Sequence, residues 1–264
     1  MRFLCIGAHP DDCELGFGGT AARLAAEGHP VKFLSVTDGR AGHHLHSPEV
    51  VAEIRRKEAL EAARRLGIAD TEVLDNPDGA LTSALGVRDE IIRRIRQWRA
   101  DVVLTHRPWD YHPDHRYTSQ AVQDAAYLMM VPHICADTPA LRRNPIFLYL
   151  QDGFRLPTPF APDVAVDIDS SWDRKIESLD AHTSQVYEWL PWISNADALP
   201  NIPESRADRL EWLSGQYARP ITASVAAALA GRYGGREIRH AEAFQICEYG
   251  RRPAPEELDA IFPR

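Results

Sequence analysis

The first 151 residues alternate short apolar runs with amphipathic segments. Five runs rich in β-branched and other apolar residues predict strands at 2–8, 31–37, 71–75, 101–106 and 146–151. Between these runs, apolar residues recur at three- and four-residue spacing, which predicts helices at about 18–27, 48–66, 87–98 and 113–130. This alternation is typical of a parallel sheet covered by helices. The pattern therefore predicts an α/β fold with a Rossmann-like, mostly parallel sheet and helices on both faces.

The pattern loosens after Gln151. A proline-rich connection leads to a short predicted strand at 163–169 and a predicted helix at about 172–190. A further helical stretch at about 204–230 and the turn "GRYGG" precede a last predicted strand at 241–249. We expect residues 152–264 to be a C-terminal elaboration on the same core, so that residues 1–264 form a single domain.

Charge and cysteine content narrow the class of protein. The formal net charge of -8 argues against a general nucleic-acid surface. The four cysteines show no CxxC pairing, which indicates reduced thiols. There is no basic segment followed by an apolar one at the start, and no apolar stretch approaches membrane-spanning length. We therefore expect a cytoplasmic protein without a membrane span.

Two loops combine histidine, proline and aspartate. The first strand is followed by "HPDD" at 9–12 and the fourth by "HPDH" at 112–115. In open parallel sheets, ligands bind beyond the carboxyl ends of the strands, often where the first and fourth strands meet. A proline at the first helical position places the flanking histidines and aspartates at helix N-termini. We expect the two clusters to face the same crevice.

These residue types suit a catalytic metal. Zinc in a catalytic site typically takes three protein ligands from His and Asp/Glu, and His9, Asp12 and His115 would supply such a set. Zinc lowers the pKa of a bound water towards about 7, so a carboxylate that is not a ligand can take the proton as attack begins. Asp11 is the candidate for that base. His112 is placed to hold the oxyanion of a tetrahedral intermediate.

The same residues carry a resemblance to a known family. With "AHPDDCELGFGGT" and "HPDH" both intact, the chain resembles the LmbE and PIG-L family of zinc-dependent de-N-acetylases. Partial matches follow along the chain: "VTDGRAG", "RRKEALEAARRLGI", "NPDG", "AHTSQ" and "AEAF". The resemblance implies one zinc ion bound by His9, Asp12 and His115. It also implies that Asp11 is the general base and that His112 stabilises the oxyanion or protonates the leaving amine.

The resemblance also implies a reaction and a substrate class. It predicts a hydrolase that removes an N-acetyl group from an N-acetylglucosamine-containing small molecule by attack of metal-bound water. Arg55 and Asp78 match polar positions around the family's sugar pocket, so we expect them to contact the substrate. Arg40 stands where the family often carries a glutamate. The sequence does not identify the aglycone. A homo-oligomer is possible, because members of the family often associate.

Two other functions are alternatives to an N-deacetylase. One is an amidase that acts on a sugar conjugate with the same metal chemistry. The other is a non-hydrolytic nucleotide-binding Rossmann module, because Gly16, Gly18 and Gly19 precede a helix and Asp38 follows the second strand. Against it, carboxylates occupy the turn after the first strand, where the dinucleotide fingerprint has glycines.

Several histidines and one tyrosine lie outside the roles that the two motifs predict. His43, His44 and His46 lie in one loop, which is an extra metal site, a lid or a solvated loop. We expect His106 to be hydrogen-bonded in the core and not a ligand. The roles of Tyr111 and His182 are open.

Overall fold

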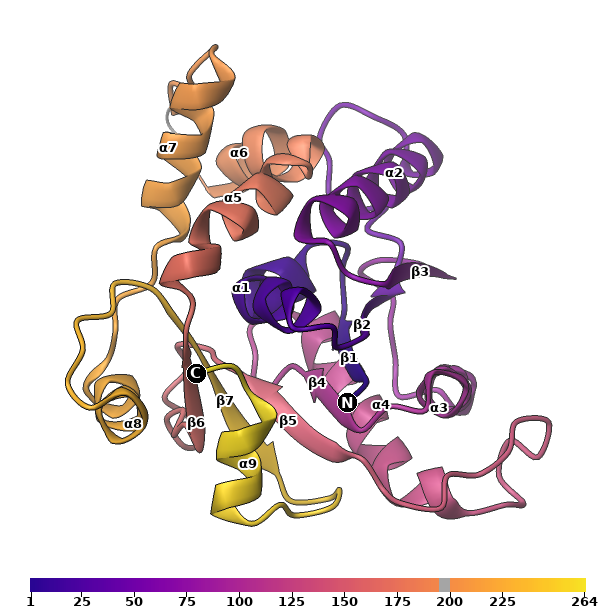
Figure 1. Cartoon of the computed structure of the whole chain (residues 1–264). Coiled ribbons are helices and arrows are strands. Elements are labelled where there is room, and N and C mark those ends of the chain that lie inside the picture. The colour runs from indigo at the N-terminus through magenta and orange to yellow at the C-terminus, as the bar shows by residue number, and fades with distance from the viewer. Residues whose placement is uncertain (195–199) are drawn as a thin grey trace.

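Seven strands form one sheet in the order β3-β2-β1-β4-β5-β7-β6 (Figure 1). The computed structural model describes residues 1–194 and 200–264. The strands are β1 (Phe3–Gly7), β2 (Val31–Thr37), β3 (Asp70–Asn76), β4 (Val102–Thr105), β5 (Ile146–Leu150), β6 (Val164–Asp167) and β7 (Ala241–Cys247). The first five strands run parallel, and β7 is antiparallel to both β5 and β6. The predicted mostly parallel α/β sheet is confirmed.

Helices cover both faces of this sheet because its inner strands, such as β1, are apolar on both sides. Along β1, Phe3 and Cys5 join one buried apolar cluster, whereas Leu4 and Ile6 join the other. Side chains alternate between the two faces of a strand, so each cluster marks one face. Helices α1 (Asp12–Ala26), α2 (Pro48–Leu66) and α5 (Trp172–Asp180) pack on the first face, and α3 (Leu85–Trp98) and α4 (Pro113–Ala126) on the second (Figure 1).

The C-terminal part extends the same sheet and packs on it. Its remaining elements are a π-helical turn (Ser184–Trp189), α6 (Leu190–Ser194), α7 (Arg206–Tyr217), α8 (Ala223–Tyr233) and α9 (Pro255–Ile261). Short 3₁₀ turns occur at Tyr127–Met130 and Asp169–Ser171. Leu213 of α7 joins the first apolar cluster, and Val225 and Leu229 of α8 pack on β6 and β7.

The helix predicted at 18–27 begins six residues earlier, at Asp12. The glycines in this region therefore lie inside α1 and do not form a loop. A Cβ at Gly16 would lie 2.8 Å from a methyl of Leu150, and one at Gly19 would lie 2.7 Å from a methyl of Ile168. Their role is to let α1 approach the sheet closely. The glycine-rich loop that a nucleotide-binding module would use to bind phosphate is therefore absent at this position.

Both long helices predicted in the C-terminal part are interrupted. The segment predicted as one helix at 172–190 is helical to Asp180 and resumes at Ser184 as a π-helical turn. The segment predicted at 204–230 is split into α7 and α8 by an extended stretch around Pro220, whose missing N–H cannot continue a helix. The short helix α9 was not predicted.

A buried ion pair joins three elements near the antiparallel edge. Lys175 Nζ of α5 donates to Glu242 Oε1 of β7 over 2.7 Å, and both side chains are buried. The same carboxylate accepts the backbone N–H groups of Gly19 and Thr20 in α1 at 3.0 and 2.8 Å. Glu242 therefore holds α1, α5 and β7 together.

All four cysteines are free. Across the two described stretches, no helix is both long enough and apolar enough to cross a membrane.

Candidate active site

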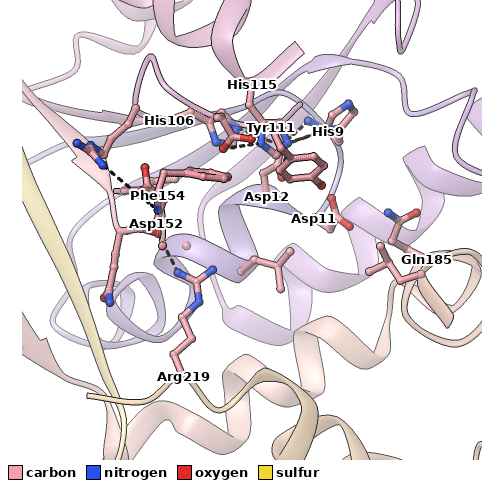
Figure 2. Close-up of a pocket in the computed structure, with 18 of the residues that line it drawn as sticks. His9, Asp11, Asp12, His106, Tyr111, His115, Asp152, Phe154, Gln185 and Arg219 are labelled. Atoms are coloured by element: carbon pink, nitrogen blue, oxygen red, sulfur yellow. Dashed lines mark hydrogen bonds and ion pairs between the residues drawn. The ribbon is translucent and has the colours of Figure 1, made fainter. Parts of the chain in front are cut away.

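The two His-Pro-Asp loops meet at one edge of the sheet. Strands β1 and β4 are neighbours, with Ile6 opposite Thr105, and both point their carboxyl ends to this edge. The loop after β1 carries residues 9–12, and the loop after β4 ends in His112, which is the N-cap of α4. The structure thus brings His9, Asp12 and His115 into contact (Figure 2).

The separations of these three side chains fit a single tetrahedral ion. His9 Nδ1 lies 3.2 Å from His115 Nε2, which lies 3.4 Å from Asp12 Oδ1. His9 Nδ1 lies 3.5 Å from Asp12 Oδ2. Two atoms that are each about 2.0–2.1 Å from a tetrahedral zinc ion lie about 3.3–3.4 Å apart. Two imidazoles and one carboxylate also form a donor set that zinc accepts.

Carboxylates hold the outer nitrogens of the two imidazoles. His9 Nε2 lies 3.0 Å from Asp78 Oδ1, and His115 Nδ1 lies 3.1 Å from Asp110 Oδ2. Histidines that bind metals usually have a carboxylate at their second nitrogen, which fixes the ring and frees the first nitrogen. For His9 this contact is a hydrogen bond, and for His115 it is an ion pair without an aligned hydrogen bond. Each ring is therefore oriented with its other nitrogen towards Asp12.

The electrostatics of the cluster favour a cation. Burial lowers the pKa of His9, but hydrogen bonds to Asp114, Asp12 and Asp78 outweigh burial and raise the pKa well above its usual value. Burial likewise lowers the pKa of His115, but Asp12 and Asp110 raise it to about 9. The same carboxylates that stabilise a proton on these rings stabilise a metal cation in its place.

His106 has a different environment from the other two histidines. Its ring stacks on His115 with centroids 4.1 Å apart. Its Nε2 accepts the backbone N–H of Ala8 at 3.0 Å and lies 3.2 Å from Asp12 Oδ2. Burial lowers the pKa of His106, and the nearby His115 lowers it further. Asp12, His106 and His115 also bring ligand atoms close enough together to hold an ion. Because the Ala8 N–H occupies the Nε2 lone pair, a supporting role for His106 stays the prediction.

Asp11 lines the same cavity as the three candidate ligands but pairs with Arg55. Its backbone φ of 152° is rare for a residue with a side chain, and such strain is common at functional sites. The side chain is 4% exposed, and its Oδ1 lies 3.4 Å from Arg55 Nη2. Burial raises the pKa of Asp11 to about 6, although Arg55 opposes the rise. A carboxylate with a pKa near neutral pH suits a general base.

Arg55 and Asp78 both have protein partners. Arg55 is 1% exposed, and its Nη2 donates to the carbonyl of Pro10 over 2.5 Å. Asp78 pairs with His9 through one oxygen and accepts the N–H of Ala41 at 3.1 Å through the other. These contacts support the loop at 9–12. Substrate contact by the two residues stays a prediction.

The hydrogen bonding of His112 determines which ring nitrogen carries its proton. His112 Nδ1 accepts the backbone N–H of Asp114 at 3.2 Å, so the neutral ring has its proton on Nε2. Burial lowers the pKa of His112, and His9 and His115 lower it further, which favours this neutral form. A neutral ring with a free Nε2–H can donate a hydrogen bond to a developing oxyanion.

Two cavities meet at the cluster. One, of about 590 Å³, is lined by Asp11, Asp12 and His115 together with residues of the C-terminal part (Figure 2). The other, of about 540 Å³, is lined by His112, Arg55 and Asp78. Both have the size of small-molecule sites. Four residues line both cavities: His9, Tyr111, Gln185 and Leu190.

The histidine loop at 43–46 is tied to the π-helical turn. His43 Nδ1 accepts the backbone N–H groups of Leu45 and His46 at 3.1 and 3.4 Å, so its proton is on Nε2, 2.8 Å from Glu188 Oε2. The ring of His44 stacks on Trp192 with centroids 4.7 Å apart. His43, His46 and Glu188 bring ligand atoms close enough together to hold an ion, so the extra metal site stays an alternative. Gly42, just before this loop, lines the second cavity.

His182 is fully buried beside the site. Its Nε2 lies 3.4 Å from Glu14 Oε1, which is an ion-pair distance. Neither ring nitrogen has a hydrogen-bond partner among the described residues.

Asp110 and Asp114 have supporting roles that the sequence did not predict. Asp110 orients His115, and Asp114 accepts the backbone N–H groups of Gly79 and Leu81 at 2.7 and 3.3 Å. Asp114 thereby fixes the loop that carries Asp78. Their only signal in the sequence was their position in or beside the second histidine motif.

Comparison with known proteins agrees with this geometry. Residues 4–126 match the PIG-L family, described as GlcNAc-PI de-N-acetylase. Diacetylchitobiose deacetylase of Thermococcus kodakarensis is 32% identical over 202 residues, which cover 72% of this chain and 73% of that protein. A probable N-acetyl-alpha-D-glucosaminyl L-malate deacetylase 2 of Bacillus cereus is 29% identical over 80% of this chain and 93% of that protein. The structure of N,N'-diacetylchitobiose deacetylase from Pyrococcus horikoshii has a TM-score of 0.71 at 26% identity and covers 94% of this chain and 84% of that one.

The fold, the site and these relatives define the class of protein. It is a deacetylase, a hydrolase that acts on amide C–N bonds. The chain belongs to the PIG-L family, and the resemblance noted in its sequence is confirmed.

Proposed function

We propose that this chain is a zinc-dependent hydrolase that removes an N-acetyl group from an N-acetylglucosamine-containing small molecule. The names of its relatives support the substrate class, since one is a deacetylase of diacetylchitobiose and another of an N-acetylglucosaminyl malate. The observation that carries the chemistry is the trio of side chains His9, Asp12 and His115, whose nearest donor atoms lie 3.2–3.5 Å apart, with one Asp12 oxygen towards each ring. A separate buried carboxylate, Asp11, lies beside the trio in a cavity of about 590 Å³.

His9, Asp12 and His115 would hold the zinc ion, with Asp78 and Asp110 orienting the two rings. When bound, zinc supplies a Lewis acid that polarises the acyl oxygen and lowers the pKa of a water towards about 7. Asp11 takes the proton that the attacking water loses, because it faces the same cavity and is not among the ligands.

His112 acts on the other side of the reacting amide. Its Nε2–H donates a hydrogen bond to the oxyanion of the tetrahedral intermediate. A neutral ring has no second proton to give, so the proton that Asp11 takes from the water is the one that passes to the leaving amine. The Asp114 N–H bond to Nδ1 keeps the proton on the nitrogen that this role needs. Oxyanion donors of this kind are worth about 10²- to 10³-fold in kcat.

A substrate panel tests the proposed activity. The purified protein, loaded with zinc, is assayed for acetate release from N-acetylglucosaminides and from N-acetyl amino acids. We expect cleavage of the glucosaminides only, because a site built to bond ring hydroxyls is left with unpaired polar groups by substrates that lack them. Faster cleavage of a larger acyl group on the same sugar would establish the amidase alternative. Equal rates on sugars and amino acids would refute the proposed substrate class.

A further inference from the structure

Gln185 lies at the junction of the two cavities and lines both of them. Gln185 is 9% exposed, and its Oε1 is buried without a hydrogen-bond partner. Within the described part of the chain, no hydrogen bond from its Nε2 is found either. Figure 2 shows its carboxamide on the Asp11 side of the cavity. A buried polar group without a partner is unfavourable in the free protein, so it signals a partner that arrives with a ligand.

The backbone around Gln185 is anchored from both sides. Ser184 donates its N–H and its hydroxyl to the two oxygens of Glu58, each over 2.7 Å. Tyr187 donates its hydroxyl to Asp180 over 2.8 Å. Both residues belong to the π-helical turn at Ser184–Trp189, a geometry that occurs frequently at functional sites. The backbone that carries Gln185 is therefore fixed before any ligand binds.

The neighbours of Gln185 limit what that ligand group can be. Asp11 and His9 line the first cavity beside it, so a group that meets Gln185 lies close to the reacting amide. A carboxamide offers one acceptor and two N–H donors, which match a hydroxyl that both donates and accepts. An apolar or fully anionic group would leave part of the carboxamide unpaired.

We propose that Gln185 is a specificity residue that hydrogen-bonds one ring hydroxyl of the sugar. The inference rests on the proposed function, because it needs a hydroxylated ring at the junction of the cavities. In this role Gln185 selects N-acetyl sugars over other N-acetyl compounds and takes no part in proton transfer or metal binding.

A double-mutant cycle between protein and substrate tests the proposal. Gln185→Met keeps the length of the side chain and removes its polar atoms. The matched control is Gln216→Met, at an exposed position on α7 that lines neither cavity. Each protein is assayed for kcat/KM on methyl N-acetylglucosaminide and on its 3-, 4- and 6-deoxy analogues. Zinc content and Tm are measured in parallel.

We expect Gln185→Met to lower kcat/KM on the parent sugar by about 5- to 100-fold, as for the loss of one partner of a buried hydrogen bond. On one deoxy analogue the variant and the wild type should agree within about twofold, because the bond is already absent there. Zinc content and Tm should not change, and Gln216→Met should match the wild type. If Gln185→Met does not fold, Gln185→Glu, which keeps the acceptor, should retain coupling to the same hydroxyl.

The possible results separate the inference from the proposed function. An equal loss on the parent sugar and on every deoxy analogue would overturn the inference alone, because no hydroxyl would then be coupled to Gln185. A loss accompanied by less zinc or a lower Tm would do the same by assigning Gln185 a structural role. A wild type that releases acetate from none of these sugars would refute the proposed function, and the inference with it.

Discussion

Asp11 and Asp12 are adjacent and chemically identical, yet their environments give them opposite properties. Burial raises the pKa of both, but His115 and His106 then lower the pKa of Asp12 well below its usual value. The pKa of Asp11 is instead raised to about 6, since burial and the charge of Asp12 outweigh the opposing effects of Arg55, His182 and His9. Asp12 therefore stays charged, as a metal ligand must, whereas Asp11 can exchange a proton near neutral pH.

Substitution of each aspartate should separate these two roles. We expect Asp11→Asn to keep its zinc and its fold but to lose about 10²- to 10⁴-fold in kcat, the usual worth of a general base. We expect Asp12→Asn to bind zinc weakly and to regain part of its activity when zinc is added. Metal titration and steady-state kinetics measure both. A metal-free Asp11→Asn protein, or a zinc-replete Asp12→Asn one, would overturn the division of roles.

The contact between Asp110 and His115 gives a second prediction at this scale. Asp110→Asn weakens the acceptor that orients His115 Nδ1, so we expect zinc affinity to fall by about 10- to 100-fold. Asp124→Asn, at an exposed position of α4, serves as the control and should leave the affinity unchanged. Competition with a zinc chelator measures the affinity. Equal affinities for the two variants would show that Asp110 does not support the ligand.

The buried position of Arg55 makes its role testable through a split between kcat and KM. If Arg55 contacts the sugar, Arg55→Met should raise KM with little change in kcat. If its bonds to Pro10 and Asp11 matter more, kcat should fall with little change in KM. From the burial of Arg55 we expect the fall in kcat. A rise in KM alone would instead support the predicted contact of Arg55 with the sugar.

Among the secondary-structure elements, those with clear local signals were predicted well. The bounds of β2 and α2 match the predicted ranges, because each combines a regular apolar pattern with a proline or glycine at its ends. Helix α1 was shortened in the prediction because glycines disfavour helices locally, whereas close packing against Leu150 and Ile168 requires them. The break between α7 and α8 occurs at Pro220. It was not predicted because the apolar pattern continues on both sides of this proline and favoured one helix.

The ion pair of Lys175 with Glu242 gives a prediction at the scale of elements. Lys175→Met leaves the carboxylate of Glu242 buried with two backbone N–H partners but without its countercharge. We expect the free energy of unfolding to fall by about 3–5 kcal/mol, as for other broken buried pairs. Lys57→Met, which removes an exposed pair with Glu53, should cost less than about 1 kcal/mol. Denaturant unfolding of both variants decides this, and equal losses would contradict the assigned role of Glu242.

At the scale of the whole molecule, the site combines what sequence motifs reveal with what only the fold brings together. The five residues proposed for metal and catalysis come from two short motifs, and the neighbouring positions of β1 and β4 were enough to predict their meeting. The support of Asp110 for His115 and the anchoring of Gln185 through Glu58 could not be predicted. These contacts join segments far apart in the chain, or depend on side-chain directions that no local pattern specifies.

The central claim is that His9, Asp12 and His115 hold one zinc ion on which deacetylation depends. The most direct test measures metal content by elemental analysis and acetate release from an N-acetylglucosaminide on the same samples: wild type, chelator-treated wild type, and His115→Ala. We expect about one zinc per chain in the wild type, loss of activity on chelation, recovery when zinc is returned, and neither bound zinc nor activity in His115→Ala. Full activity in the chelated protein, or full zinc content in His115→Ala, would contradict the account.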